Sequence, residues 1–464
     1  MKKRPAATAH DLPKVPSVFK VLGPSFLLLG LALGSGELIL WPSLTATHGM
    51  GLIWGALLGI SLQYILNTEV MRYTLYWGES VFVGFRRISI LLTLWYILST
   101  VIPWSLPAFA SLSASIITHV FPSLSHQGVA IVLLLLTGIF LTSRRSVYAT
   151  LEKYQKTALL VGIPFMLFLL ILIAQPADYQ SLFRGLAGMG DGWWLLPSNI
   201  VLTTFIAACA YSGAGGNLNL AQSYYIKEKG FGMGAYLPKL STFFTGSHTQ
   251  VMPLTGATFP KTSLNVKRWD SWWRLITLEH GLVFWFLGFV SIAALALLAA
   301  STVYGNHVES SGLSFLFFEA TAIGLQTHPI LGSLFVLVSA LFLFSTQLGV
   351  YESASRIISE NIVLLGGVSQ KKKVHLGKHF SYVVWGLVGL GITVYVAGFQ
   401  EPKALLTFSA LLNAGAMLSS FLFILLLNAR RLEPRYRPSW IRTLLMLVGA
   451  VFFGVLLCLL FFQT

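Results

Sequence analysis

The sequence predicts an all-α polytopic membrane protein, in which an inverted repeat of five plus five helices is followed by an eleventh helix. Of its 464 residues, 55% are hydrophobic and only 10% are charged, whereas soluble domains carry about 25% charged residues. Apolar stretches long enough to cross a bilayer recur along the whole chain. Glycine clusters interrupt two of these stretches, which lie five stretches apart, and this spacing predicts the repeat.

Eleven apolar stretches have the length of about 20 residues that a helix needs to span the hydrocarbon core. They cover residues 22–47, 51–76, 90–119, 127–143, 154–175, 196–226, 272–301, 330–365, 379–398, 404–428 and 441–462.

The basic residues support this count and predict an orientation. If the N-terminus is cytoplasmic, all of the 31 Lys and Arg residues except Arg184 and Lys403 fall on inward segments, as the positive-inside rule requires. We therefore expect a cytoplasmic N-terminus and an outward C-terminus, in a plasma membrane such as the bacterial inner membrane. The net charge of +15 then reflects contact with anionic lipid head groups, and no nucleic-acid partner is expected.

These spans divide the chain into four parts. We expect a cytoplasmic tail at 1–21, a first repeat at 22–176, a second repeat at 177–428 and the eleventh span within 429–464. The second repeat contains a cytoplasmic loop, 227–271, which is too short for a domain and is expected to pack as an inner cap. No obligate protein partner is indicated.

Two interruptions mark the first and sixth spans. The first carries "GSGE" near its centre and the sixth carries "YSGAGGN". Because glycine costs about 1 kcal/mol in a helix interior, such clusters favour local unwinding. The two interrupted spans lie five spans apart. Because five is an odd number, the two halves of the chain would lie in the membrane with opposite orientation, as in transporters whose substrate site forms where two broken helices meet. The alternative is that the glycines only permit close helix packing. The predicted substrate-binding residues are Gly34, Ser35, Gly36, Glu37, Tyr211, Ser212, Gly213, Ala214, Gly215, Gly216 and Asn217.

Glu37 is the one acidic residue that the sequence places near the bilayer centre. A charge there costs from about 2.5 to more than 10 kcal/mol, so such residues usually face a cavity and have partners. We predict that Glu37 binds a cation or carries a coupling proton. The alternative is a protonated carboxylic acid with a structural hydrogen bond.

Other polar groups lie toward the ends of the spans. Glu69 and Arg72 are three residues apart near the inner end of the second span, and Glu352 and Arg356 are four apart near the inner end of the eighth. Residues at these helical spacings can form ion pairs. The simple interpretation is a neutralised pair where each helix meets the cytoplasm, and a coupling or gating role is the alternative.

Four further polar residues lie within the predicted spans. Gln347 and Asn413 lie deeper, in the eighth and tenth spans, and each is either an interhelical hydrogen-bonding group or a site residue with a coupling or gating role. Glu279 and His280 fall near the start of the seventh span beside a basic loop. We expect these two residues to form a solvated helix end.

The sequence contains no nucleotide-binding loop, zinc-ligand spacing or nucleophile motif in a usable context. "GAGGN" lacks the Lys and the preceding strand of a phosphate-binding loop. An enzyme, an ATP-driven pump and a resident cofactor are therefore not expected, and ion coupling is the natural source of energy.

Several motifs resemble those of a known family. The opening "GPSFLLLGLALGSGEL" is similar to the first helix of Nramp-type divalent-metal transporters, and "GAGGNLNLAQS" resembles their sixth-helix Met-Pro-His-Asn-Leu stretch. Gln347 and the "LLN" that ends at Asn413 are similar to polar positions on the eighth and tenth helices. The resemblance covers nearly the whole chain, and it implies a LeuT-type inverted repeat with broken helices one and six.

The resemblance also shows which metal-site residues are replaced. A thioether selects softer metals, whereas carboxylate, carbonyl and water suit Mg and Mn, so a hard divalent cation fits this chain better than iron. Glu37 and Asn217 are the residues that could still bind such a metal. Carried over by position, the family's Asp, Pro and Asn of helix one fall on Gly34, Ser35 and Glu37, and its sixth-helix Met, His and Asn fall on Ala214, Gly216 and Asn217.

The predicted function is secondary active transport of a cation by alternating access, with the proton as the candidate coupling ion. A small organic cation or an amino acid is the alternative substrate, because Gly and Ala in place of large ligands enlarge the pocket around Glu37 and Tyr211. A second alternative is a non-transporting membrane receptor, which would bind its ligand without uptake. The expected partners are a small solute or metal ion and membrane lipid.

Overall fold

The computed structural model describes residues 10–16, 21–143, 147–237, 252–306, 313–368 and 373–463. The α-helices of this part of the chain are α2 Pro24–Ala32, α3 Trp41–His48, α4 Ile53–Trp77, α5 Val81–Ile88, α6 Ile90–Trp104, α7 Ala108–Val120, α8 His126–Ser143, α9 Val147–Ile173, α10 Pro176–Leu186, α11 Leu202–Ala210, α12 Gln222–Lys229, α13 Ser263–His280, α14 Leu287–Thr302, α15 Ser314–Gln326, α16 Pro329–Leu365, α17 Leu376–Val396, α18 Pro402–Arg431 and α19 Trp440–Gln463. Tighter or wider helical turns occur at η1 Leu33–Leu40, η2 Met50–Leu52, η3 Gly216–Ala221, η4 Gly232–Tyr236, η6 Gly281–Phe286 and η7 Pro434–Tyr436.

Ten helical runs among the described residues are long and apolar enough to cross a membrane. The sixth of the eleven predicted spans is missing from the ten because it is divided into α11 and α12. Large apolar side chains such as Leu91, Ile171 and Leu325 are exposed on the bundle, the last of them to 83%. A surface of this kind is stable in hydrocarbon, so the chain has the properties of an integral membrane protein.

The first span differs from the sixth. It is helical from Pro24 to His48, and over its glycine cluster the hydrogen bonding changes from α to π at η1. The unwinding predicted for both interruptions therefore occurs in the sixth span, whereas the first keeps its helical course as a wider turn. The reason for this difference lies in a contact with α16, described below.

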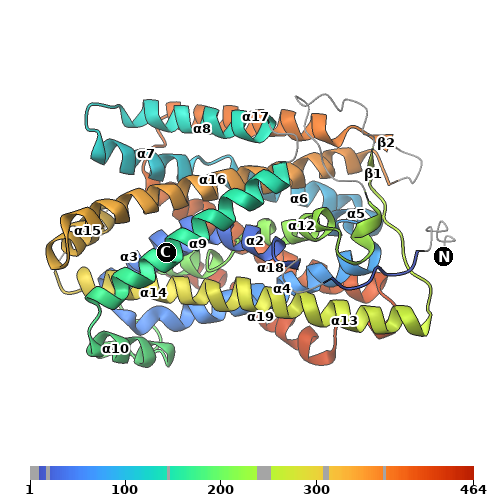
Figure 1. Ribbon diagram of the computed structural model, residues 1–464, viewed down its shortest axis with the longest axis horizontal. Helices are drawn as coiled ribbons and strands as arrows, with labels where there is room; N and C mark the ends of the chain where they lie inside the picture. Colours follow the sequence, from blue (N-terminus) through green and yellow to red (C-terminus); the bar gives the residue numbers. More distant parts are fainter. Residues whose placement is uncertain are drawn as a thin grey trace.

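The long helices lie roughly side by side along one axis of the molecule (Figure 1). The helices α10 and α15 lie at one end of this bundle, and α5 and the two short strands lie at the other (Figure 1). The strands β1, Met252–Pro253, and β2, Lys373–Val374, pair antiparallel with Met252 opposite Val374. We call the end with the strands the inner end, after the prediction that the segments rich in Lys and Arg face the cytoplasm.

The inner end is covered by the described parts of the predicted tail and loop. The Leu12 amide donates to Asn265 Oδ1 at 3.0 Å, and the Trp272 indole donates to the Pro13 carbonyl at 2.9 Å. The helix α13 already begins at Ser263, so the loop is shorter than predicted and the seventh span starts earlier. The remaining residues of the tail and loop lie outside the described residues.

Candidate functional site

The sixth helix is broken inside the bundle. The helix α11 ends at Ala210, and regular structure resumes at Gly216. Gly215 and Gly216 have φ of +77° and +51°, a region in which only glycine is free of strain. The glycine cluster is therefore needed for the course of the chain at the break, which we define as residues 211–215.

Gln63 of α4 holds the two sides of the break together. Its side-chain nitrogen donates to the Ala210 carbonyl at 3.1 Å. Its side-chain oxygen accepts hydrogen bonds from the Gly215 amide at 3.3 Å and from Asn219 at 3.1 Å. These bonds replace some of those that the backbone loses where the helix ends. Sequence reasoning missed Gln63, although a lone amide in the apolar run "SLQYIL" was a signal.

The first helix meets the break at Gly36. A Cβ at this position would lie 1.9 Å from the Tyr211 carbonyl oxygen, a distance that no side chain tolerates. Gly36 therefore lets the two helices touch through their backbones. The two interruptions that the sequence predicted as a pair are in contact.

The hydroxyl of Thr346 in α16 is inserted into the first helix. It accepts from the Gly34 amide at 2.9 Å and donates to the Gly30 carbonyl, also at 2.9 Å. A side chain inserted between these groups replaces the α-helical hydrogen bond and widens the turn. This contact explains why the first span becomes a π-helix instead of unwinding.

Glu37 is fully buried and faces the seventh span. Its carboxylate accepts a hydrogen bond from the hydroxyl of Ser291 in α14. Its other oxygen, Oε1, has no hydrogen-bond partner in the described part of the chain and lies near Gly288. The side chain of Ser35 lies outside the described residues.

Asn217 and Glu37 have different hydrogen-bonding partners. Its amide nitrogen donates to Ser99 at 2.8 Å and to Thr100 at 2.9 Å, both on α6. The two predicted metal ligands thus share no hydrogen-bonding partner, and the described residues contain no group of three or more His, Cys, Asp or Glu placed to hold a metal.

Tyr211 joins the break to α18. Its hydroxyl lies 2.9 Å from that of Ser409 and accepts from the Asn413 amide at 3.0 Å. Its ring stacks on Trp104 with centroids 5.9 Å apart. The Asn413 oxygen has no hydrogen-bond partner among the described residues, and a Cβ at Gly216 would lie 1.9 Å from it. An unpaired acceptor therefore faces the break.

The other predicted site residues are also buried. Ser212 accepts from the Trp41 indole at 3.0 Å, and Gly213 packs on Gln63, whose oxygen a Cβ would approach to 2.5 Å. Ala214 is 2% exposed. Gln347 is buried in α16 directly after Thr346, so it lies next to the contact with the first helix.

At the inner end, an ion-pair network fastens α12 to α16. Arg356 pairs with Glu352 of its own helix and with Glu228 of α12, the latter at 2.9 Å. The Tyr225 hydroxyl lies 2.6 Å from that of Ser353. All these side chains are buried, so the predicted helix-end pair is part of a contact between two spans.

The predicted ion pair of Glu69 and Arg72 also includes residues of other spans. Glu69 binds Arg72 at 2.8 Å, as predicted, and accepts from Arg442 of α19 at 2.5 Å. Asn428 of α18 donates to Glu69 at 3.1 Å. The Arg72 guanidinium lies over the ring of Trp273 at 3.8 Å. The second, tenth and eleventh spans therefore meet at one buried carboxylate.

A third inner contact was not predicted. Glu152 of α9 pairs with Lys156 at 2.7 Å and with Lys229, which ends α12, at 2.8 Å. The inner half of the sixth helix is thus held on two sides, by Arg356 and by Glu152.

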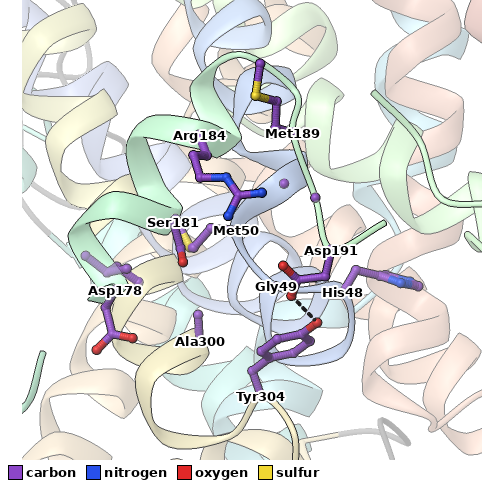
Figure 2. Close-up of a pocket in the computed structure, with 13 residues that line it drawn as sticks. His48, Gly49, Met50, Asp178, Ser181, Arg184, Met189, Asp191, Ala300 and Tyr304 are labelled. Atoms are coloured by element: carbon purple, nitrogen blue, oxygen red, sulfur yellow. Dashed lines mark hydrogen bonds between the residues drawn. The ribbon is translucent and has the colours of Figure 1, made fainter. Parts of the chain in front are cut away.

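The outer end contains a small cavity of about 60 Å³. Asp178, Arg184 and Asp191 lie around it together with Tyr304 (Figure 2). The Tyr304 hydroxyl donates to Asp191 at 2.8 Å. Partial burial, and then the Asp191 carboxylate, raise the pKa of Tyr304 above its ordinary value. The cavity is polar and lies beside α10, where α3 and α14 end.

Glu279 and His280 are not at a solvated helix end. Ser25 donates to Glu279 at 2.5 Å and lies 2.7 Å from His280 Nδ1, and all three residues are buried. Because α13 begins at Ser263 and the helical run continues to Thr302, these residues lie about four turns from its start, within the run. The expectation of a solvated end was wrong for this reason.

Comparisons with known proteins bear on the fold. No family model and no curated protein matches the chain. Among solved structures, a manganese transporter of Eremococcus coleocola in complex with an aromatic bis-isothiourea substituted compound is similar, with 13% identity, a TM-score of 0.67, and coverage of 97% of this chain and 88% of that one. Mhp1, a nucleobase-cation-symport-1 family transporter in a closed conformation with bromovinylhydantoin bound, has 13% identity, a TM-score of 0.55, and coverage of 96% and 91%. At these identities the likeness shows the fold, and it confirms the predicted LeuT type.

Proposed function

We propose that this chain is a secondary transporter that works by alternating access around the break in the sixth helix. The observation that carries the proposal is the contact of Gly36 with the Tyr211 carbonyl, at a point where the sixth helix is unwound inside the bundle. Transporters with inverted repeats form their substrate sites at such discontinuous helices near the midplane of the membrane. Two proteins that share the fold are transporters, which supports the same conclusion.

The direction of access follows from the ends of the bundle. The inner end, rich in Lys and Arg, faces the cytoplasm under the positive-inside rule. There Arg356 and Glu152 hold the inner half of the sixth helix, and we interpret these contacts as a closed inner gate. Inward release requires these ion pairs to separate.

A hard divalent cation such as Mg²⁺ or Mn²⁺ is the first candidate substrate. The groups at the break are hydroxyls and amides, including the unpaired oxygen of Asn413, and neutral oxygen donors suit such ions. Glu37 supplies the negative charge next to Gly36, where the first helix touches the break.

A small organic cation or an amino acid is the second candidate. The stacked rings of Trp104 and Tyr211 lie beside the Asn413 acceptor. An aromatic face attracts organic ammonium groups through cation–π interactions, and the amide oxygen can accept a hydrogen bond from the same group.

Uptake into proteoliposomes tests the proposal. The purified full-length protein should take up one member of a panel of Mg²⁺, Mn²⁺, Ca²⁺, amines and amino acids. Gly216→Ala should abolish uptake, because its Cβ would collide with Asn413, whereas Gly415→Ala should not, because no atom lies within 4 Å of a Cβ there. If calorimetry detects binding of a panel member without any uptake, the protein is a receptor and the proposal is wrong.

A further inference from the structure

Two polar contacts join the first and seventh spans at matching positions. Ser25 of α2 bonds Glu279 and His280, and Ser291 of α14 bonds Glu37. Glu37 follows Ser25 by twelve residues, and Ser291 follows Glu279 by the same number. The two spans therefore run parallel, with the contacts about 18 Å apart along them at 1.5 Å per residue.

Each contact contains groups that can accept and release a proton. The Ser25 hydroxyl lies between a carboxylate and an imidazole, and a hydroxyl can donate to one partner while it accepts from the other. Oε1 of Glu279 and Nε2 of His280 have no hydrogen-bond partner in the described part of the chain. Both residues are buried, Glu279 with 3% and His280 with 0% of its surface exposed. Because unpaired buried charge is costly, such groups tend to be neutral and to share protons.

The surroundings connect this cluster to the inner gate. Tyr64 of α4 stacks on His280 with centroids 5.6 Å apart. From α9, Lys156 donates to the Leu22 carbonyl at 3.0 Å and pairs with Glu152. The other charged groups that face this region are Lys229, bound to Glu152, and Arg442, near Tyr64.

A helical irregularity separates the two contacts. The π-helical segment η6, Gly281–Phe286, begins directly after His280, and the ring of Phe284 stacks on His280 with centroids 4.6 Å apart. Segments of this kind are frequent at functional sites. A change in η6 would alter the distance between the contact at Glu279 and His280 and the contact at Glu37.

We infer that Glu279, His280 and Ser25 form a proton-binding site on the inner side of Glu37, through which transport is coupled to inward proton movement. The inference rests on the proposed function. In each cycle one proton is taken up by the Glu279 and His280 pair through the Ser25 hydroxyl and is then released to cytoplasmic water. A proton that enters from outside with the cargo then takes its place at the pair.

Vesicles that contain a pH-sensitive dye test the coupling, with Mn²⁺ as the probe. The parent should acidify the lumen as Mn²⁺ enters and should accumulate Mn²⁺ when a proton gradient is imposed. Glu279→Gln should lose both effects and keep the exchange of Mn²⁺ across the membrane, which needs no net proton transfer. Glu319→Gln, which removes another buried carboxyl, on α15, should behave as the parent. Coupling that persists in Glu279→Gln, or is lost equally in Glu319→Gln, overturns the inference.

A second measurement does not depend on the cargo. Infrared difference spectra of the purified protein at varied pH should contain a protonated-carboxyl band that disappears in Glu279→Gln and shifts in its titration in His280→Gln. If the parent transports no Mn²⁺ but this band titrates, the choice of cargo fails and the proton site stands. If no titrating band is lost, the proton site is wrong whatever the vesicles transport.

Discussion

The Thr346 hydroxyl accepts a hydrogen bond from the Gly34 amide at 2.9 Å, so a side chain of the eighth span completes the backbone bonding of the first. A Cβ at Gly34 would lie 2.6 Å from this hydroxyl. Gly34 is the position at which the family resemblance places a metal-binding Asp. In this chain Thr346 fills that space, which supports the view that its substrate is bound by other groups.

Removing the hydroxyl should therefore weaken the centre of the bundle. Thr346→Val keeps the shape of the side chain and leaves the Gly34 amide without its partner, and an unsatisfied buried group costs about 1–3 kcal/mol. We expect a lower thermal unfolding temperature in detergent and slower uptake. Thr346→Ser retains the hydroxyl and should stay close to the parent. Equal behaviour of the Val and Ser variants would show that the inserted hydroxyl is unimportant.

The contact between the first helix and the break predicts a severe effect at Gly36. In Gly36→Ala the Cβ would have to displace the Tyr211 carbonyl, which moves the first helix away from the break in the sixth. Uptake should be lost even if size-exclusion chromatography shows a folded protein. Gly389→Ala, at a position in α17 with no atom within 4 Å of a Cβ, is the matched control. Normal uptake by Gly36→Ala would exclude a tight contact at this point.

Gln63 should be as important as the glycines. Gln63→Leu removes both the donor to Ala210 and the acceptor for Gly215, and each orphaned group costs about 1–3 kcal/mol. Gln63→Glu keeps the acceptor and, when protonated, can also donate. We expect Glu to preserve more uptake than Leu and the difference to shrink as the pH rises. The uptake rates of both variants across a pH series provide the measurement, and equal rates at low pH would contradict the role.

Hydropathy and glycine content were sufficient to predict the bundle and the break in the sixth helix. The state of the first helix was not predictable in this way. Whether a glycine cluster unwinds or becomes a π-helix depends on Thr346, which is more than 300 residues away in sequence. The contact becomes apparent only when the eighth span is packed against the first.

The error at Glu279 and His280 has a different cause. The helix α13 opens with the polar and charged sequence "SLNVKRWDSWWR", which a search for apolar spans assigns to a loop. With its start placed too late, the buried pair was taken for the helix end. Gln63 was missed because a single amide in an apolar run gives no indication of what it bonds.

The proposed inner gate gives the last prediction. Arg356 is buried between Glu352 and Glu228, and removing one partner of such a pair costs about 3–5 kcal/mol. The pair with Glu228 exists only while α12 and α16 are together. Arg356→Gln should therefore shift the protein toward the state with an open inner gate. The reporter is Ser223→Cys, a buried position in α12, in a background without the two native cysteines, Cys209→Ala and Cys458→Ser. It is labelled from the cytoplasmic side with an impermeant maleimide. Labelling should be faster in Arg356→Gln than in the parent. The control is Arg435→Gln, which breaks an exposed pair with Asp270 at 3.7 Å. It should have no effect on labelling, because surface pairs contribute little. Unchanged labelling in Arg356→Gln would mean that this network stabilises the helices without closing the gate.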